Sequence, residues 1–400
     1  MSKKNDDFFK AKKEWSTVKD DILACYFKPY VSKILHTNKP LLYVDCFAGK
    51  GKFDDGSPGS PLIALKIVDE CLQATTMRKT SVETVFIDLN YADDLKKNLV
   101  AYPSAKIVAG KYEDEICSIL KGKHGRNVFL YIDPYGIKAL KCAMFDQFAN
   151  SRFNSIELLI NLNSFGFIRA ACNALGATFS EQEMLEGLVE YSPTRMDTTE
   201  QSINALNEIA GGDYWKTIIR NYQIGLIDGY EAEDQFTKQY CNRLSKCYKY
   251  VLNMPLRIKR GQRPKYRLIH ATNHSAGCLL MVDNICNRWE SLRDLQTGGQ
   301  ISFWPENCNN QAVDSIDLTK KVIDHFSQVK VPTSLSDVLA KFFVRFGPIC
   351  ATSDVYVILK EMEENGRAEF IRDPSVTRNG KPSTFMIEGR GKTVSVRWNT

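Results

Sequence analysis

Apolar residues up to position 162 gather into short runs that alternate with longer amphipathic segments. The runs have the length and composition of buried strands, and they lie at residues 41–45, 84–88, 106–108, 127–132 and 156–162. The segments between them, such as 61–75 and 92–99, have helical periodicity. Short apolar strands that alternate with helices predict an α/β fold, with a parallel sheet covered by helices on both faces.

The alternation stops near residue 166. Residues 166–245 are mostly helical and polar in pattern, and we interpret them as an insertion that caps a pocket or shapes a substrate groove. Two strand-like runs follow, at 248–258 and 265–272, and their basic Gly- and Pro-containing junction predicts a hairpin. A parallel five-stranded core with a terminal hairpin fits the Rossmann-like sheet of class I methyltransferases, which ends in an antiparallel strand.

The last part of the chain has a pattern of its own. Residues 301–317 are rich in Asn, Pro and Gln and predict a linker. After it, helical periodicity and two strand-like runs recur, at 318–326, 335–346, 354–364, 368–372 and 384–388. Helices followed by a basic-tipped hairpin predict a winged-helix domain over 318–400. The expected organisation is therefore a flexible start (1–12), a methyltransferase-like domain (13–300), a linker and a winged helix.

The stretch LLYVDCFAGKGKFDDGSPGSPLIAL, residues 41–65, is the centre of the first domain. A strand ends at Asp45, a glycine-rich loop follows, and Ser60-Pro61 begins a helix. Such a loop forms a nucleotide-type pocket at the carboxyl end of a parallel strand. We assign Asp45, Phe47, Gly49 and Gly51 to cofactor binding. The alternative is a plain glycine turn.

The loop lacks residues that two common phosphate-binding motifs require, and this absence indicates which kind of nucleotide it can bind. Phe53 stands where a Walker loop needs Ser or Thr after Gly-Lys, and Asp54 replaces the third glycine of a dinucleotide fingerprint. An acidic loop without a phosphate cradle suits a ligand that carries an amino group, and S-adenosylmethionine (SAM) is such a ligand. Asp88 ends the second strand and can bind ribose hydroxyls, although it can also be a strand-ending turn residue.

A second string, D-P-Y-G at residues 133–136, follows the most apolar strand. Asp133 and the Pro134 carbonyl can accept hydrogen bonds from an exocyclic amine, and Tyr135 can stack on a base, as in enzymes that flip their target base. We therefore assign Asp133, Pro134 and Tyr135 to catalysis. The usual amino-methyltransferase string has a second proline that is missing here, so a structural turn stays an alternative.

Residues 243–267 contain nine Lys or Arg side chains, no acid and three interleaved tyrosines. Basic residues with aromatics between them are typical of a surface that follows a nucleic-acid backbone. The residues assigned to this surface are Arg257, Lys259, Arg260, Arg263 and Lys265. Tyr248 and Tyr266 are the candidate rings for stacking on bases at this surface. The alternative is a solvated hairpin that binds no nucleic acid.

The charge, hydropathy and cysteine content of the chain indicate its kind of partner and its cellular compartment. The net charge of +6 over 400 residues is a mild indication of an anionic partner. The longest apolar runs are strand-sized, so no membrane span is expected. The 12 cysteines include no C-x-x-C pair, which favours reduced thiols in a cytoplasmic protein. His270 and His274 lack nearby Cys or carboxylate partners, so no metal site is predicted.

Five strings together resemble one known family. They are YVDCFAGKGKFDDGSPGSPLIAL, VFIDLN, LYIDPYGIK, LLINLNSF and HATNHSAGCLLMVDN, and they cover roughly residues 20–290. With them the chain resembles the three-Cys-motif partner family. The resemblance implies a methyltransferase-like fold and a partner that is a radical-SAM-like protein with a three-cysteine motif. It implies no settled activity.

These patterns favour a SAM-dependent methyltransferase that acts on nucleic acid, at an exocyclic base amine. The alternative is a catalytically retired methyltransferase fold that binds nucleic acid or a partner protein, and the incomplete D-P-P-Y string favours it. Fold alone does not decide between them.

The basic hairpin generates a testable prediction. If Arg257, Lys259, Arg260 and Arg263 contact phosphates, the log–log salt slope of nucleic-acid binding should include a contribution of about −2.8 to −3.6. Replacing all four with Ala should flatten the slope by that amount and weaken binding to different sequences about equally. Filter binding across a salt series measures both. An unchanged slope in the quadruple variant would indicate a solvated hairpin.

Overall fold

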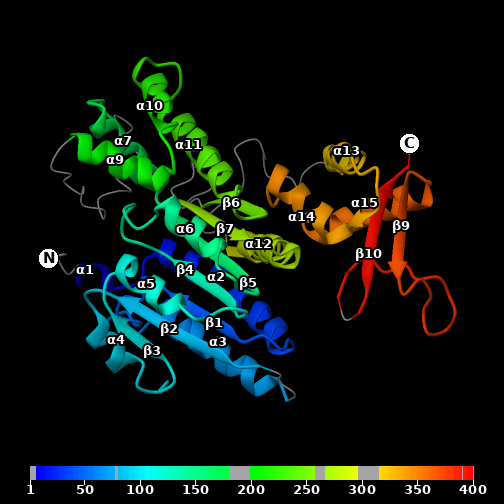
Figure 1. Cartoon of the computed structure of the whole chain (residues 1–400), viewed down its shortest axis with the longest axis horizontal. Coiled ribbons are helices and arrows are strands. Elements are labelled where there is room, and N and C mark those ends of the chain that lie inside the picture. Colours follow the sequence, from blue (N-terminus) through cyan, green and yellow to red (C-terminus); the bar gives the residue numbers. More distant parts are fainter. Residues whose placement is uncertain are drawn as a thin grey trace. The chain divides into compact units, whose positions relative to one another are not determined.

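The computed structural model describes residues 6–76, 80–179, 199–256, 266–295, 315–389 and 391–399. The chain divides into two compact units, each with its own core (Figure 1). The first comprises residues 1–273 and 299–302, and the second comprises 274–298 and 303–400. No helix in these described ranges is long and apolar enough to cross a membrane.

A seven-stranded sheet of order β3-β2-β1-β4-β5-β7-β6 forms the centre of the first unit (Figure 1). Its strands are β1 (Leu41–Asp45), β2 (Val82–Asp88), β3 (Lys106–Ala109), β4 (Asn127–Ile132), β5 (Ser155–Leu162), β6 (Tyr250–Leu256) and β7 (Tyr266–Thr272). Strands β1 to β5 pair in parallel, and β7 is antiparallel to both β5 and β6. The expected mixed α/β fold with a mostly parallel sheet is confirmed.

Helices cover both faces of this sheet, as a parallel sheet requires. They are α1 (Asp6–Phe9), α2 (Glu14–Leu35), α3 (Ser60–Ala74), α4 (Ala92–Asn98), α5 (Tyr112–Leu120) and α6 (Cys142–Ala149). Alternate residues of β1 face opposite sides: Leu42 and Val44 join the core cluster that contains Ile116 of α5. Tyr43 instead packs its ring 4.6 Å from that of Phe27 on α2. The fully apolar strands therefore reflect burial on both faces.

Four helices lie between β5 and β6 within the described residues: α7 (Ser164–Ala174), α9 (Thr199–Ala210), α10 (Trp215–Gln223) and α11 (Gly229–Leu244). Their packing is aromatic, with the rings of Phe167 and Phe236 stacked at 3.9 Å. Arg267 of β7 is 7% exposed, and its guanidinium donates to both carboxylate oxygens of Glu233 on α11, at 2.9 and 2.6 Å. This buried ion pair joins the helical segment to the antiparallel edge of the sheet.

The second unit combines helices with a small antiparallel sheet of order β8-β10-β9. Its elements are α12 (Ser275–Leu295), α13 (Ser315–Phe326), β8 (Thr333–Ser334), α14 (Leu335–Phe346), α15 (Thr352–Glu364), β9 (Ala368–Asp373) and β10 (Thr393–Trp398). Asp283 of α12 accepts hydrogen bonds from the backbone N–H and hydroxyl of Thr352, the first residue of α15.

Two features of this unit differ from the sequence-based expectations. The strand that pairs with β9 is β10 at 393–398, and the expected strand at 384–388 is wrong, because those residues have no ladder partner. The burial alternation of Val394 and Val396 explains why β10 forms the ladder. In addition, α12 groups with the second unit, although the sequence analysis assigns residues up to 300 to the first domain. Residues 296–314, which include most of the expected linker, lie outside the described part of the chain.

The Arg267–Glu233 pair predicts a large effect of a single substitution. Arg267→Met should lower the free energy of unfolding of the first unit by about 3–5 kcal/mol, because Glu233 would stay buried without its partner. Urea unfolding followed by circular dichroism measures the shift. A matched control is Lys238→Ala, which breaks an exposed pair on the same helix (Lys238 Nζ to Asp234 Oδ2, 2.6 Å) and should cost less than about 1 kcal/mol. Equal effects of the two variants would contradict this account.

Candidate functional site

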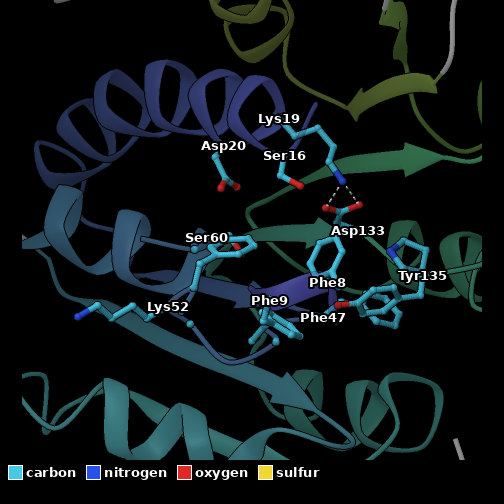
Figure 2. Close-up of a pocket in the computed structure, with 16 residues that line it drawn as sticks. Phe8, Phe9, Ser16, Lys19, Asp20, Phe47, Lys52, Ser60, Asp133 and Tyr135 are labelled. Carbon is cyan, nitrogen blue, oxygen red and sulfur yellow. Dashed lines mark hydrogen bonds and ion pairs between the residues drawn. The ribbon is translucent and has the colours of Figure 1, made fainter. Parts of the chain in front are cut away.

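A cavity lies in the first unit at the carboxyl ends of β1 and β4 (Figure 2). These strands are neighbours, with Asp45 opposite Tyr131, so the loops that follow them meet. All but two of the residues predicted for cofactor binding and catalysis line this cavity: Phe47, Gly49, Gly51, Asp133, Pro134 and Tyr135. The exceptions are Asp45 and Asp88. The empty space of the cavity is about 750 Å³, including the part open to solvent.

Asp45 lies behind the cavity wall and is fully buried. Its carboxylate accepts hydrogen bonds from the Ser60 hydroxyl at 2.7 Å and from the Phe47 backbone N–H at 3.2 Å. Burial raises the pKa of Asp45, and the two hydrogen bonds lower it. The nearby carboxylates of Asp133 and Asp20 also raise the pKa, which is about 7 with all of these effects together. Asp45 therefore joins the start of α3 to the glycine loop.

Asp88 holds the glycine loop from the other side. Its carboxylate accepts from the backbone N–H groups of Gly49 (2.9 Å), Asn90 (2.8 Å) and Tyr91 (2.7 Å). These bonds attach the loop after β1 to the turn after β2. Since the carboxylate already takes three backbone donors, its observed role is to clamp the loop, and the ribose contact stays a prediction.

The glycines of the loop are required by its conformation. Gly49 and Gly51 have φ values of +59° and +75°, in the left-handed region that favours glycine. A Cβ atom on Gly51 would also lie 2.7 Å from Leu95 Cδ1 of α4. The backbone can therefore approach a ligand closely at these positions, as the sequence pattern indicates.

Asp133 is engaged by a residue that the sequence analysis does not single out. Lys19 Nζ, on α2, lies 2.8 and 2.6 Å from the two carboxylate oxygens of Asp133 (Figure 2). Asn161 Nδ2 donates to Asp133 Oδ1 at 2.7 Å. The Lys19 side chain is only 8% exposed. A charge pair of this kind fixes the orientation of Asp133 beside Tyr135, whose ring is at the cavity mouth and 42% exposed.

Helix α2 contributes two further polar side chains to the cavity lining, Ser16 and Asp20. Lys12 Nζ pairs with Asp20 Oδ2 at 2.7 Å, and both side chains are nearly buried. Burial raises the pKa of Asp20 to about 6, although Lys12 and Lys19 oppose the rise. The Ser16 hydroxyl is buried and has no hydrogen-bond partner in the described structure.

Residues 6–12, expected from their polar composition to be flexible, pack against the glycine loop. Phe9 is 4% exposed, and its ring lies 5.7 Å from that of Phe53 and 4.8 Å from that of Tyr91. The Phe8 ring lies 5.3 Å from that of Tyr135. The Phe9 carbonyl also accepts from the Asp54 backbone N–H at 2.8 Å. This N-terminal strap, residues 8–12, forms one wall of the cavity.

The proposed nucleic-acid residues Arg257, Lys259, Arg260, Arg263 and Lys265 lie outside the described residues. The strands that flank them are described and form the predicted hairpin. Tyr248 and Tyr266 are buried, so the expectation that their rings stack on bases is wrong, and the third interleaved tyrosine, Tyr250, is buried as well. Their apolar bodies fill the core beneath the hairpin instead. Within the described ranges, no group of three or more His, Cys, Asp and Glu side chains is arranged to hold a metal ion.

Comparisons with known proteins give distant likenesses. No protein-family model matches the chain, and no curated protein matches it. Among solved structures, LPL1258 from Legionella pneumophila str. Philadelphia 1, of the family DUF519, is 11% identical at a TM-score of 0.40, over 71% of this chain and 95% of that one.

Two further structures are similar at lower scores. The methyltransferase candidate yhhF from Escherichia coli is 15% identical at a TM-score of 0.24, over 38% of this chain and 71% of that one. PKMT2 from Rickettsia typhi is 11% identical at a TM-score of 0.29, over 86% of this chain and 73% of that one. At these scores the likeness has no weight for ligand or activity. The order of strands, with a glycine loop after β1, defines a methyltransferase-like fold.

The raised pKa of Asp45 predicts a stability that depends on pH. The carboxyl of Asp45 ionises near the ordinary aspartate pKa of 3.8 in the unfolded chain, whereas in the folded protein it keeps its proton to about pH 7. The folded state therefore binds more protons, and stability falls as pH rises from about 4 to 7. Asp45→Asn should remove this part of the fall, which is at most roughly 4 kcal/mol.

Urea unfolding of both proteins at pH 5 and pH 8 measures the difference. The variant should gain stability relative to the parent at pH 8 and much less at pH 5. A variant that loses equal stability at both pH values would contradict the raised pKa.

Proposed function

We propose that the first unit binds SAM in this cavity and transfers its methyl group to a nucleic acid. One observation carries the proposal: the glycine loop after β1 and the Asp133-Pro134-Tyr135 segment after β4 line a single cavity. In the reaction, the bond between the methyl carbon and the sulfonium breaks, a carbon–nitrogen bond forms, and the acceptor amine loses a proton. The other product is S-adenosylhomocysteine.

The residues of the cavity fit this cofactor. Gly49 and Gly51 line the cavity with backbone alone, since a Cβ atom at these positions would lie 2.9 Å from the Phe9 ring and 2.7 Å from Leu95 Cδ1. The carboxylates of Asp20 and Asp45 interact electrostatically, and such a site favours a cation such as a sulfonium or an ammonium.

An exocyclic base amine is the acceptor class that the geometry supports. Tyr135 lines the cavity and is 42% exposed, and its ring, which packs edge-on against that of Phe8, offers a surface on which a flipped base can stack. A carboxylate has about four acceptor sites. Lys19 and Asn161 take three contacts on Asp133 and leave room for one donor from the base.

The second unit supports a nucleic-acid partner through its order of elements. The series α13, β8, α14, α15, β9 and β10 is that of a winged helix, which we propose as the class of this unit. The basic side chains near the loop after β9 are not all available, because the Arg372 guanidinium donates to both carboxylate oxygens of Glu363 at 2.7 Å. Arg378 and Lys381, in the loop after β9, are exposed and are the better phosphate contacts.

A second candidate function rests on the Lys19–Asp133 pair. An aspartate held by a nearly buried lysine on both oxygens is also what a structural turn would show, once catalysis has been lost. In that case the fold would serve as a binding protein, for nucleic acid or for the three-cysteine-motif partner that the family resemblance implies.

The two candidates predict different results for SAM and for Asp133→Asn. The parent protein should bind SAM in calorimetry and methylate nucleic acid, as detected by mass spectrometry of nucleosides. Asp133→Asn should keep cofactor affinity near normal and lower the rate by about 10²–10³, because a preorganised acceptor is lost. Arg372→Gln, in the other unit, controls for general effects of a lost charge and should retain activity.

The outcomes are distinct. SAM binding without turnover on DNA or RNA would favour the binding protein. Absence of SAM binding would overturn the proposed cofactor. Full activity of Asp133→Asn would show that the D-P-Y-G string is structural.

A further inference from the structure

The first turns of α2 form a wall of the cavity that the methyltransferase motifs do not include. Ser16, Lys19 and Asp20 line the cavity from this helix. Figure 2 shows Ser16 and Asp20 pointing away from the helix axis toward the glycine loop, with Lys19 reaching Asp133. These positions lie on one face of α2, because residues three and four apart are neighbours on a helix.

Ser16 is the clearest sign that this wall meets a ligand. Its side chain belongs to a residue that is 6% exposed, and its Oγ atom has no partner in the described structure. A buried hydroxyl without a hydrogen bond is unfavourable unless a bound group supplies one. The cavity is the place from which such a group can reach it, since Ser16 is part of the lining.

The charges of the wall alternate in sign. Two of the three N–H groups of Lys19 are directed to Asp133 at 2.6 and 2.8 Å, which leaves one for another acceptor. The carboxylate of Asp20 lies close enough to Lys19 and Asp133 to interact with both, and its Oδ2 pairs with Lys12. A cation and an anion side by side, with a free hydroxyl, are complementary to a zwitterion rather than to a single charge.

We propose that this wall recognises the α-amino acid end of the ligand. Lys19 would pair with the ligand carboxylate, while Asp20 and Ser16 would accept from the ammonium group. The nucleoside part would then lie toward the glycine loop and Phe47. This proposal rests on the proposed function and adds the residues that distinguish an amino acid–bearing nucleoside from a nucleoside without that group.

Two commercial ligands separate the amino acid end from the rest. S-adenosylhomocysteine carries it, and 5′-methylthioadenosine has the same adenosine and thioether but lacks it. Calorimetry of the full chain at pH 8 should show that S-adenosylhomocysteine binds about tenfold or more tightly, because hydrogen bonds to charged groups add to its affinity.

The variants follow from the contacts. Ser16→Ala removes a hydroxyl that has no partner in the described structure, so folding should be unaffected, whereas affinity for S-adenosylhomocysteine should fall several-fold. Asp20→Asn and Lys19→Met should lower it by about tenfold or more. All three should leave the affinity for 5′-methylthioadenosine unchanged. Thr17→Ala is the matched control, because Thr17 is exposed on the same helix and does not line the cavity.

The results distinguish this inference from the proposed function. If the parent binds neither ligand, the proposed cofactor fails and the inference fails with it. If the parent binds both ligands equally, or if Ser16→Ala and Asp20→Asn weaken both equally, SAM binding stands and the amino acid site on α2 is overturned. A loss confined to S-adenosylhomocysteine supports the site.

Discussion

The first unit depends on keeping three aspartates in a small space under α2. Asp20, Asp45 and Asp133 come from a helix and two strand ends, and their charges interact. Burial of a carboxylate is unfavourable unless it is paired and hydrogen-bonded. Lys12 and Lys19 supply the paired charges, and Ser60 and Asn161 supply further donors; the contacts are Lys12–Asp20, Lys19–Asp133, Ser60–Asp45 and Asn161–Asp133.

This charge arrangement explains why the walls of the cavity are held together. Lys12, in the N-terminal strap, contacts two other segments: its ammonium reaches Asp20 of α2 and the Pro58 carbonyl of the glycine loop, and its backbone N–H donates to Asp55 Oδ2 of the same loop. The N-terminal strap, the glycine loop and α2 are therefore joined through one residue. Asp88 completes the arrangement by binding the loop to the end of β2. A cationic ligand would enter a site in which acids and bases are already oriented.

The strands, the glycine loop and the D-P-Y-G segment could be predicted because their signals are local. A run such as residues 127–132 is apolar whichever neighbour it finds, and Gly51 is needed for its own backbone angle. The role of Tyr248 was not predictable in this way, because interleaving with basic residues does not say on which face of a strand a ring lies. Its ring is in the core. The position of β10 failed for a similar reason, since two runs of comparable apolar character compete for one ladder partner.

The residues of α2 that line the cavity could have been predicted from the helical pattern of buried and polar positions. Its buried face runs through Leu23, Phe27 and Tyr30, and Ser16, Lys19 and Asp20 continue that face toward the start of the helix. Polar residues on the buried face of a helix indicate either partners in the core or a site. The sequence does not show which residue is the partner of Lys19. Lys19 and Asp133 are 114 residues apart in the chain, and the packing of α2 in the folded protein brings them together.

We propose that SAM binds in one cavity of the first unit. The walls of this cavity are the N-terminal strap, the glycine loop, the start of α2 and the segment after β4. Hydrogen exchange with mass spectrometry, on the full chain with and without SAM, tests it most directly. The account predicts slower exchange of backbone amides in residues 8–20, 46–60 and 133–136, with little change in the second unit. Exchange rates that SAM leaves unchanged in the glycine loop, or protection confined to another part of the chain, would contradict it.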